Sequence, residues 1–141
     1  IPVHVAFHWL LRRTDGLPGV ESMPVPESVD SQVPNPYRVH DGTLYASFAD
    51  FRCPDNCSEP EALCTVTREP RRTNLFEELA KLEVPGFAVE VIRSFQLAPG
   101  VGGYTGGQLR DLERRVLQKG GFCLIATSCR CHGVINALRR T

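Results

Sequence analysis

The stretch that decides the fold is residues 87–127, FAVEVIRSFQLAPGVGGYTGGQLRDLERRVLQKGGFCLIAT. It opens with a mostly apolar run at 87–92 and closes with a second apolar run at 122–127, both rich in β-branched residues. Short runs of this kind are typical of strands that are covered on both faces. The stretch therefore predicts two buried strands with a long connection between them.

The connection between the two runs carries the signals of a helix. Thr105 and Gln108 have the spacing of a capping box, in which each side chain bonds the other residue's backbone N–H. Apolar residues then recur at steps of three and four until a pair of glycines ends the pattern, at Leu109, Leu112 and Val116. A strand, a helix and a second strand in this order predict a parallel pair with a crossover helix.

The rest of the chain after residue 42 extends this alternation. TLYASF at 43–48 is expected to be a strand, and the segment 74–83 a helix that begins at a capping box of Asn74 and Glu77. VINALRR at 134–140 is expected to be the last helix. The predicted fold class is α/β, with a three-layer-like parallel sheet and crossover helices.

The first 42 residues are expected to form an N-terminal segment and an arm. Residues 1–13 fit either a strand or a short helix. Residues 14–42 contain five prolines and three glycines, which disfavour both ladders and helices. We therefore expect a Pro/Gly-rich arm at 1–42 before a Cys-rich α/β domain at 43–141, within one domain overall.

Composition favours a cytoplasmic protein without a membrane span. Of the 141 residues, 42% are hydrophobic and the formal net charge is zero. No apolar run approaches the length of about 20 residues that spans a bilayer. The first residues do not resemble a signal peptide, so six cysteines are interpreted as thiols or metal ligands ahead of disulfides.

The C-terminal part is basic, with seven Arg or Lys against two acids over residues 110–141. No aromatic residues alternate with these cations, as they would in a protein that binds single-stranded nucleic acid. A solvated helix face is the favoured interpretation, and nucleic acid is not an expected partner.

The cysteines form two groups, FRCPDNCSEPEALC at 51–64 and SCRCHG at 128–133. If all strands are parallel, both groups follow strands that end at one edge of the sheet, where open α/β sheets bind ligands. Cys123 lies inside a predicted strand and is expected to be an ordinary core thiol.

Four thiols from these groups can complete a metal site. Cys53, Cys57 and Cys64 would supply three ligands and Cys131 the fourth, for zinc or an iron–sulfur cluster. Cys129 and His132 are further candidate ligands. The alternative is a set of free or redox-active thiols, because a helix after Cys129 and Cys131 would lower their pKa and favour a nucleophilic role.

The Gly-rich loop could hold an anion, since glycines let backbone N–H groups approach a phosphate. The candidate residues are Gly100, Gly102, Gly103, Thr105 and Gly106. The loop matches neither a P-loop nor G-x-G-x-x-G, and a structural turn is an equally good interpretation.

Three segments together resemble a group of prokaryotic proteins that are often labelled as potassium-transport or NAD-binding regulators: FRCPDNCSEPEALCTVT, SFQLAPGVGGYTGGQL and ATSCRCHGVINAL. The similarity covers about residues 43–138. It implies a Rossmann-like nucleotide-binding part before this chain, which would then be a C-terminal portion. It implies no particular reaction or ligand set.

The expected function is thus a cytoplasmic domain that binds zinc or an iron–sulfur cluster in a regulatory or redox role. The alternative is a thiol-dependent enzyme that uses Cys129 or Cys131, with the Gly-rich loop holding an anionic substrate.

Overall fold

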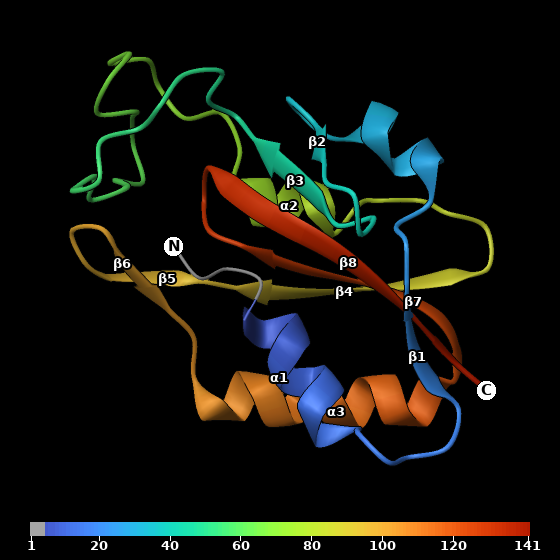
Figure 1. The fold of residues 1–141 in the computed structure, drawn as a ribbon. Coiled ribbons are helices and arrows are strands. Elements are labelled where there is room, and N and C mark those ends of the chain that lie inside the picture. The colour runs from blue at the N-terminus through green and yellow to red at the C-terminus, as the bar shows by residue number, and fades with distance from the viewer. Residues whose placement is uncertain (1–4) are drawn as a thin grey trace.

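The computed structural model describes residues 5–141 and contains three α-helices, a 3-10 helix and eight strands in this part of the chain (Figure 1). The elements are α1 (Val5–Arg13), β1 (Val20–Met23), η1 (Glu27–Gln32), β2 (Tyr37–Arg38), β3 (Leu44–Ser47), α2 (Leu75–Leu79), β4 (Phe87–Arg93), β5 (Phe95–Ala98), β6 (Val101–Gly103), α3 (Gly106–Lys119), β7 (Gly121–Ser128) and β8 (His132–Arg140). None of the helices within 5–141 has the length and apolar character to cross a bilayer.

Six of the strands form one mixed sheet in which β8 is central. The order is β2-β3-β8-β7-β4, and β1 pairs with the far end of β8. Every pairing is antiparallel except that of β4 with β7. The predicted parallel sheet is therefore wrong, and the fold is a mixed α/β arrangement with a mostly antiparallel sheet.

The parallel sheet was predicted because residues 134–140 were expected to form a helix, whereas they belong to strand β8. A turn at 129–131 joins β7 directly to β8, and a connection this short requires antiparallel strands. Residues 133–138 of β8 are buried on both faces of the sheet. A strand buried on both faces shows no alternation, so its short apolar run resembles a helix segment in sequence.

The crossover unit is confirmed. β4 and β7 are parallel, with Phe87 opposite Phe122, and α3 connects them. The capping box forms as predicted: the Thr105 hydroxyl accepts the Gln108 N–H at 3.1 Å, and the Gln108 amide oxygen accepts the Thr105 N–H at 2.7 Å. Gly120 ends the helix.

Two further elements agree in part with the expectation. The strand predicted at 43–48 is β3. The helix predicted at 74–83 is shorter and is α2, with Asn74 as its N-cap but no hydrogen bond from the Asn74 side chain to the helix. The Asn74 amide oxygen instead accepts a hydrogen bond from Arg130 Nη1 at 2.9 Å. The predicted capping box at this position is wrong because a distant arginine uses the acceptor.

The segment 14–42 is part of the sheet, contrary to the expectation of an arm without ladders. β1 pairs with β8 over four residues, and the valines at 25, 29 and 33 are buried. The prolines do not prevent this, because they lie before and after β1, at the N-cap of η1 and before β2. Residues 1–4 of the strand-or-helix segment lie outside the described part, and residues 5–13 are helical.

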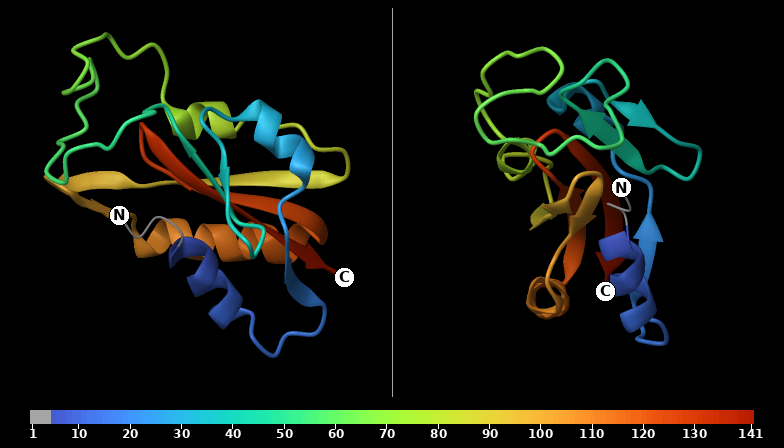
Figure 2. Two further views of the ribbon diagram at one scale, coloured as in Figure 1. Left: turned by 45° about the horizontal axis from the view of Figure 1, so that its top comes forward. Right: turned by 90° about the vertical axis from the view of Figure 1, so that its left-hand side faces the viewer.

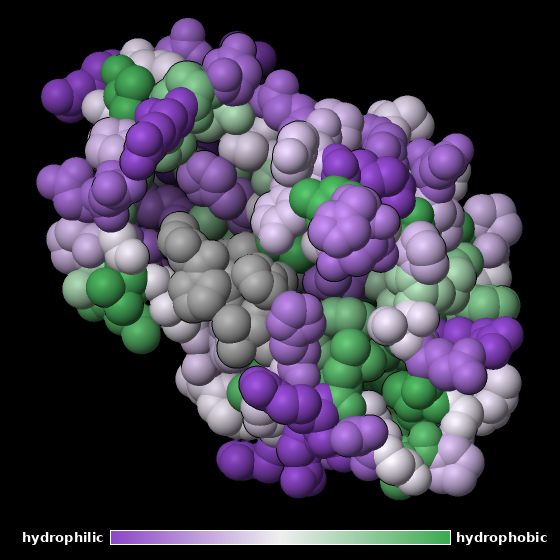
Figure 3. Space-filling model, in the orientation of Figure 1, coloured by the Kyte–Doolittle hydropathy of each residue, from purple (hydrophilic) through white to green (hydrophobic). Residues whose placement is uncertain are grey.

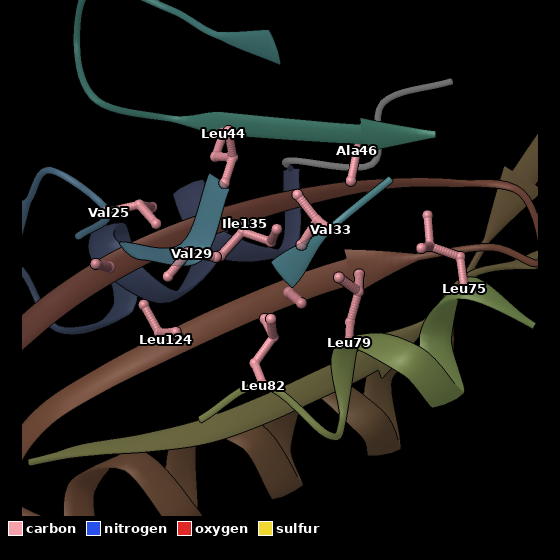
Figure 4. Packing of buried hydrophobic residues seen from close by; sticks show 12 residues of the cluster. Val25, Val29, Val33, Leu44, Ala46, Leu75, Leu79, Leu82, Leu124 and Ile135 are labelled. Atoms are coloured by element: carbon pink, nitrogen blue, oxygen red, sulfur yellow. The ribbon is translucent and has the colours of Figure 1, made fainter. Parts of the chain in front are cut away.

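Hydrophobic clusters cover both faces of the sheet. Figure 4 shows the first cluster, in which Val29 of η1 and Leu79 of α2 pack on the sheet together with Leu44 of the strand β3. On the other face, α1 and α3 lie together below the sheet (Figures 1 and 2). Cys123 belongs to this second cluster with 5% of its surface exposed, which confirms that it is a core thiol.

A buried carboxylate ties α3 to β4. Glu90 is 6% exposed and accepts hydrogen bonds from Arg115 Nε and Lys119 Nζ, both at 2.7 Å. Burial by itself raises the pKa of Glu90, but the bonds from Lys119 and Arg115 outweigh it and hold this pKa below its ordinary value. The ionised form is thus the one that stabilises the fold.

Replacing Glu90 by Gln should lower the free energy of unfolding by about 1–3 kcal/mol near neutral pH, because two charged donors lose a charged partner. Since the folded pKa is lowered, the contribution is complete above the unfolded pKa of about 4.3 and is lost as the pH falls through the folded value. Urea denaturation at neutral and acidic pH measures this contribution of Glu90 to the free energy of unfolding. Asp111→Asn, which breaks the exposed pair with Arg114, should cost less than about 0.5 kcal/mol. An equal loss for Glu90→Gln at both pH values would contradict this account.

Candidate functional site

Three strands end at one edge of the sheet even though the sheet is mostly antiparallel. β8 pairs antiparallel with both β3 and β7, so these two strands run in the same direction, and β4 is parallel to β7. At this edge Ser47 lies opposite His132 and Arg93 lies opposite Ser128. The two cysteine groups therefore meet at the predicted edge, for a reason that differs from the predicted one.

The long loop at 48–74 is fastened to the β7–β8 turn at both ends. The Phe48 N–H donates to the Cys131 carbonyl at 2.9 Å, and the Leu75 N–H donates to the Arg130 carbonyl at 2.8 Å. Figure 1 shows this loop in green near the start of β8. The first cysteine group is thus held against the second by backbone hydrogen bonds.

The loop, β3 and the turn enclose a hollow of about 1280 Å³. His132 and four half-buried cysteines from the two groups line this hollow. The cysteines are Cys53, Cys57, Cys64 and Cys131. The Cys53 sulfur lies 3.5 Å from His132 Nε2. Five of the six predicted metal ligands therefore face one space.

Cys129 is separated from the hollow. It is 2% exposed, and its sulfur lies 3.9 Å from Nδ1 of His132, behind the imidazole. Burial raises the pKa of Cys129 to about 12. The predicted helix after Cys131 is a strand, so no helix N-terminus lowers the pKa of either thiol. These findings speak against Cys129 as a nucleophile.

Three of the sulfurs in the hollow accept hydrogen bonds from N–H groups. Cys57 accepts one from the Glu59 backbone at 3.4 Å, and Cys131 accepts one from Arg71 Nη1 at 2.6 Å. Hydrogen bonds from the Thr67 N–H and hydroxyl and from the Val66 N–H hold the pKa of Cys64 below its usual value. Such bonds stabilise thiolate, which is the form that binds metal.

Burial opposes ionisation of two of the thiols and of the imidazole. Burial raises the pKa of Cys53, and the neighbouring thiols of Cys57 and Cys64 raise it further. Burial also raises the pKa of Cys131, although Arg71 opposes this effect. Burial lowers the pKa of His132, so its imidazole is neutral at physiological pH and can act as a ligand.

The thiols do not form a ready ligand cage. Within residues 5–141, no three His, Cys, Asp or Glu side chains are grouped closely enough to hold a metal ion. All six cysteines are free. The contacts among the candidate ligands are pairwise, as in Cys53 with His132.

The Gly-rich segment forms the β5–β6 hairpin, which supports the cysteine loop. Gln96 Nε2 donates to the Cys57 carbonyl at 2.8 Å, and Gly100 touches the Asp55 backbone so closely that a Cβ there would collide with the carbonyl oxygen. Figure 2 shows the hairpin tip meeting the loop. The Gly-rich segment thus has the structural role that was one of its two interpretations from the sequence.

The predicted anion-binding residues do not converge on one cradle. Gly100 is the close contact to the loop, and Gly102 and Gly103 belong to β6. Thr105 uses its hydroxyl within the capping box, and Gly106 is the first residue of α3. Anion binding by this segment stays a prediction.

Two site residues were missed by the sequence reasoning. Glu59 has a positive φ of 51°, and its carboxylate accepts the Arg130 backbone N–H. Arg71 donates to Cys131 across 60 positions of sequence. The only available signal for Arg71 was the basic run that follows the first cysteine group, and that run by itself names no partner.

One protein family matches almost the whole described chain: the model described as "Uncharacterized protein, C-terminal domain" matches residues 6–141. The chain belongs to this family. An "Uncharacterized protein" of Archaeoglobus fulgidus is 36% identical over 100 residues, which are 70% of this chain and 44% of the relative. The matched region thus spans less than half of that relative, and no solved structure matches significantly. Neither description mentions potassium transport or NAD binding, so that resemblance stays a prediction.

The thiols should differ in alkylation rate after reduction and removal of metal. Cys64 should react first with iodoacetamide near neutral pH, since its pKa is lowered, and Cys123 and Cys129 should react last, since burial raises the pKa of each to about 12. Peptide mapping by mass spectrometry gives the order. In urea all six should react at similar rates. A native protein in which Cys129 reacts as fast as Cys64 would contradict the structure.

The support of the loop by the hairpin can be tested with a matched pair of glycines. Gly100 and Gly86 have φ values of +75° and +81°, but only Gly100 has atoms in the path of a Cβ. Gly86→Ala should cost about 1–2 kcal/mol from backbone strain alone. Gly100→Ala should cost a further amount of about 1–3 kcal/mol through the collision. Urea denaturation gives both values, and equal values would mean that the contact with Asp55 is not rigid.

Proposed function

We propose that the domain holds a thiolate-ligated metal centre, either zinc or an iron–sulfur cluster, with Cys53, Cys57, Cys64 and Cys131 as ligands. The supporting observation is that four half-buried thiols from two distant segments line one hollow. Four sulfur ligands match the sets of structural zinc and of iron–sulfur clusters. A small closure of the loop over the hollow would be needed to bring them into one coordination shell.

Cys131 is preferred to Cys129 as the fourth ligand. Cys131 lines the hollow and its sulfur meets Arg71, whereas Cys129 lies behind the His132 ring. His132 is the reserve ligand, because its neutral Nε2 faces Cys53. In this arrangement Arg71 offsets part of the negative charge that four thiolates bring.

A centre of this kind suits a redox or regulatory role in a reducing compartment such as the cytoplasm. N–H hydrogen bonds to cysteine sulfur set the reduction potential of an iron–sulfur cluster, and three of the four proposed ligands accept such bonds. The proposal includes a longer protein, which the family description of a C-terminal domain supports. That its N-terminal part binds a nucleotide is proposed from the sequence resemblance alone.

Elemental analysis of protein purified without oxygen tests the proposal. The unchanged chain should carry zinc at about one ion per chain, or iron with the brown colour of a cluster. Cys57→Ser and Cys131→Ser should each lose most of the metal and lower the melting temperature, because metal binding contributes to folding. Cys129→Ala and Cys123→Ala are the matched controls and should keep the metal.

Neither zinc nor iron at a substantial fraction per chain, with all thiols titrating freely, would overturn the proposal. Metal that survives Cys131→Ser but not Cys129→Ala would overturn the choice of the fourth ligand. Rapid alkylation of one cysteine in a metal-free protein would favour the thiol-enzyme alternative.

A further inference from the structure

The hollow is much larger than a metal centre requires. Its volume of about 1280 Å³ exceeds the range of about 300–1000 Å³ that is usual for small-molecule sites. A single ion or small cluster at the cysteines would occupy only one part of it. The remaining space is open to a ligand of the size of a small organic molecule.

The outer wall of the hollow is apolar and aromatic. Four large apolar side chains that are exposed to solvent line this one space: Tyr37, Phe48, Phe51 and Val66. Tyr45 also lines it, with its ring 6.4 Å from the Tyr37 ring. Solvent-exposed apolar residues that gather in a concave surface indicate a binding site.

The inner end of the hollow carries a fixed positive charge. Arg71 is half-buried, and two of its nitrogens are anchored: Nε donates to the Pro60 carbonyl at 3.2 Å and Nη1 to the Cys131 sulfur at 2.6 Å. These anchors fix the plane of the guanidinium without any carboxylate. A guanidinium held in this way is prepared to bind an oxyanion.

The other charges that line the hollow have both signs. Arg52 and Arg72 are exposed at the rim, as are Asp55 and Glu69, so the rim is balanced and screened by solvent. The Glu59 carboxylate also lines the hollow and keeps its negative charge while it accepts the Arg130 backbone N–H, so Arg71 is the half-buried cation that faces it.

We propose that the hollow binds a small organic anion, with its apolar or aromatic body on the wall of Tyr37, Phe48, Phe51 and Val66 and its acidic group on Arg71. The site shares its inner end with the proposed metal centre. The ligand site consists of Arg71 and the apolar wall, and ligand binding there does not require a metal. The two proposals can therefore fail separately.

A pair of fluorescent probes separates the acidic group from the apolar body. Anilinonaphthalenesulfonate carries both, and phenylnaphthylamine is the same aromatic framework without the sulfonate. The unchanged chain of 141 residues should bind the sulfonate at one saturable site. Arg71→Gln should weaken its affinity about tenfold or more, which corresponds to the loss of one charge-assisted contact, and should change the affinity for phenylnaphthylamine less than about twofold.

Matched variants locate the site. Arg71→Lys should retain part of the affinity for the sulfonate, and Arg72→Gln, its exposed neighbour, should retain nearly all of it. Phe51→Ser should weaken both probes. Leu97→Ser is the control for the exposed apolar surface of the β5–β6 hairpin, which Figure 3 shows as a green group at the left edge, and it should change neither.

The metal content and melting temperature of each variant show whether it is folded and loaded. The same titrations on Cys57→Ser test binding without a metal, and unchanged affinity there supports the ligand site whatever the outcome for the metal. Sulfonate binding that is insensitive to Arg71→Gln, or that is lost in Leu97→Ser and kept in Phe51→Ser, would overturn the proposal.

Discussion

The pairing of β8 with strands on both sides is the constraint on which the other features depend. β7 flanks β8 along its whole length, while β3 and β1 share the other edge, β3 at the first half and β1 at the second. Because β8 is antiparallel to both β3 and β7, those two strands run in the same direction and end on the same side of the sheet. The segment 20–23, the crossover unit and the cysteine loop are all placed by this one strand.

The β7–β8 turn gives the site its rigidity. Its backbone carbonyls at Arg130 and Cys131 accept the N–H groups at the two ends of the 48–74 loop, and its Arg130 N–H donates to Glu59 within that loop. A loop of this length without helix or strand is usually either functional or disordered. Here a handful of hydrogen bonds confines it, and the β5–β6 hairpin supports its outer part through Gln96 and Gly100.

The six thiols differ in burial and in hydrogen bonding. Cys123 and Cys129 are buried, with pKa values raised to about 12, and are suited to packing. The four thiols in the hollow are half-buried, and three of them accept N–H bonds. A metal and Arg71 at one end and an apolar wall at the other would give the hollow two kinds of recognition in one space.

The sequence by itself determined the elements whose signals are local. Four features depend on nearby residues or on one crossover connection, and all were predicted: the capping box of Thr105 and Gln108, the helix that follows it, the parallel pair at 87–92 and 122–127, and the burial of Cys123. The tertiary structure decided the direction of β8, since an apolar run buried on both faces has no periodicity to show whether it is strand or helix. It also decided that the Asn74 side chain accepts a hydrogen bond from Arg130 and does not cap its own helix, and that Arg71 donates to Cys131. Finally, it decided that Cys129 faces away from the hollow. The contacts of Asn74 and Arg71 join residues 56 and 60 positions apart, and no local sequence pattern shows which distant partner a side chain will meet. The orientation of Cys129 depends instead on the tight antiparallel turn between β7 and β8.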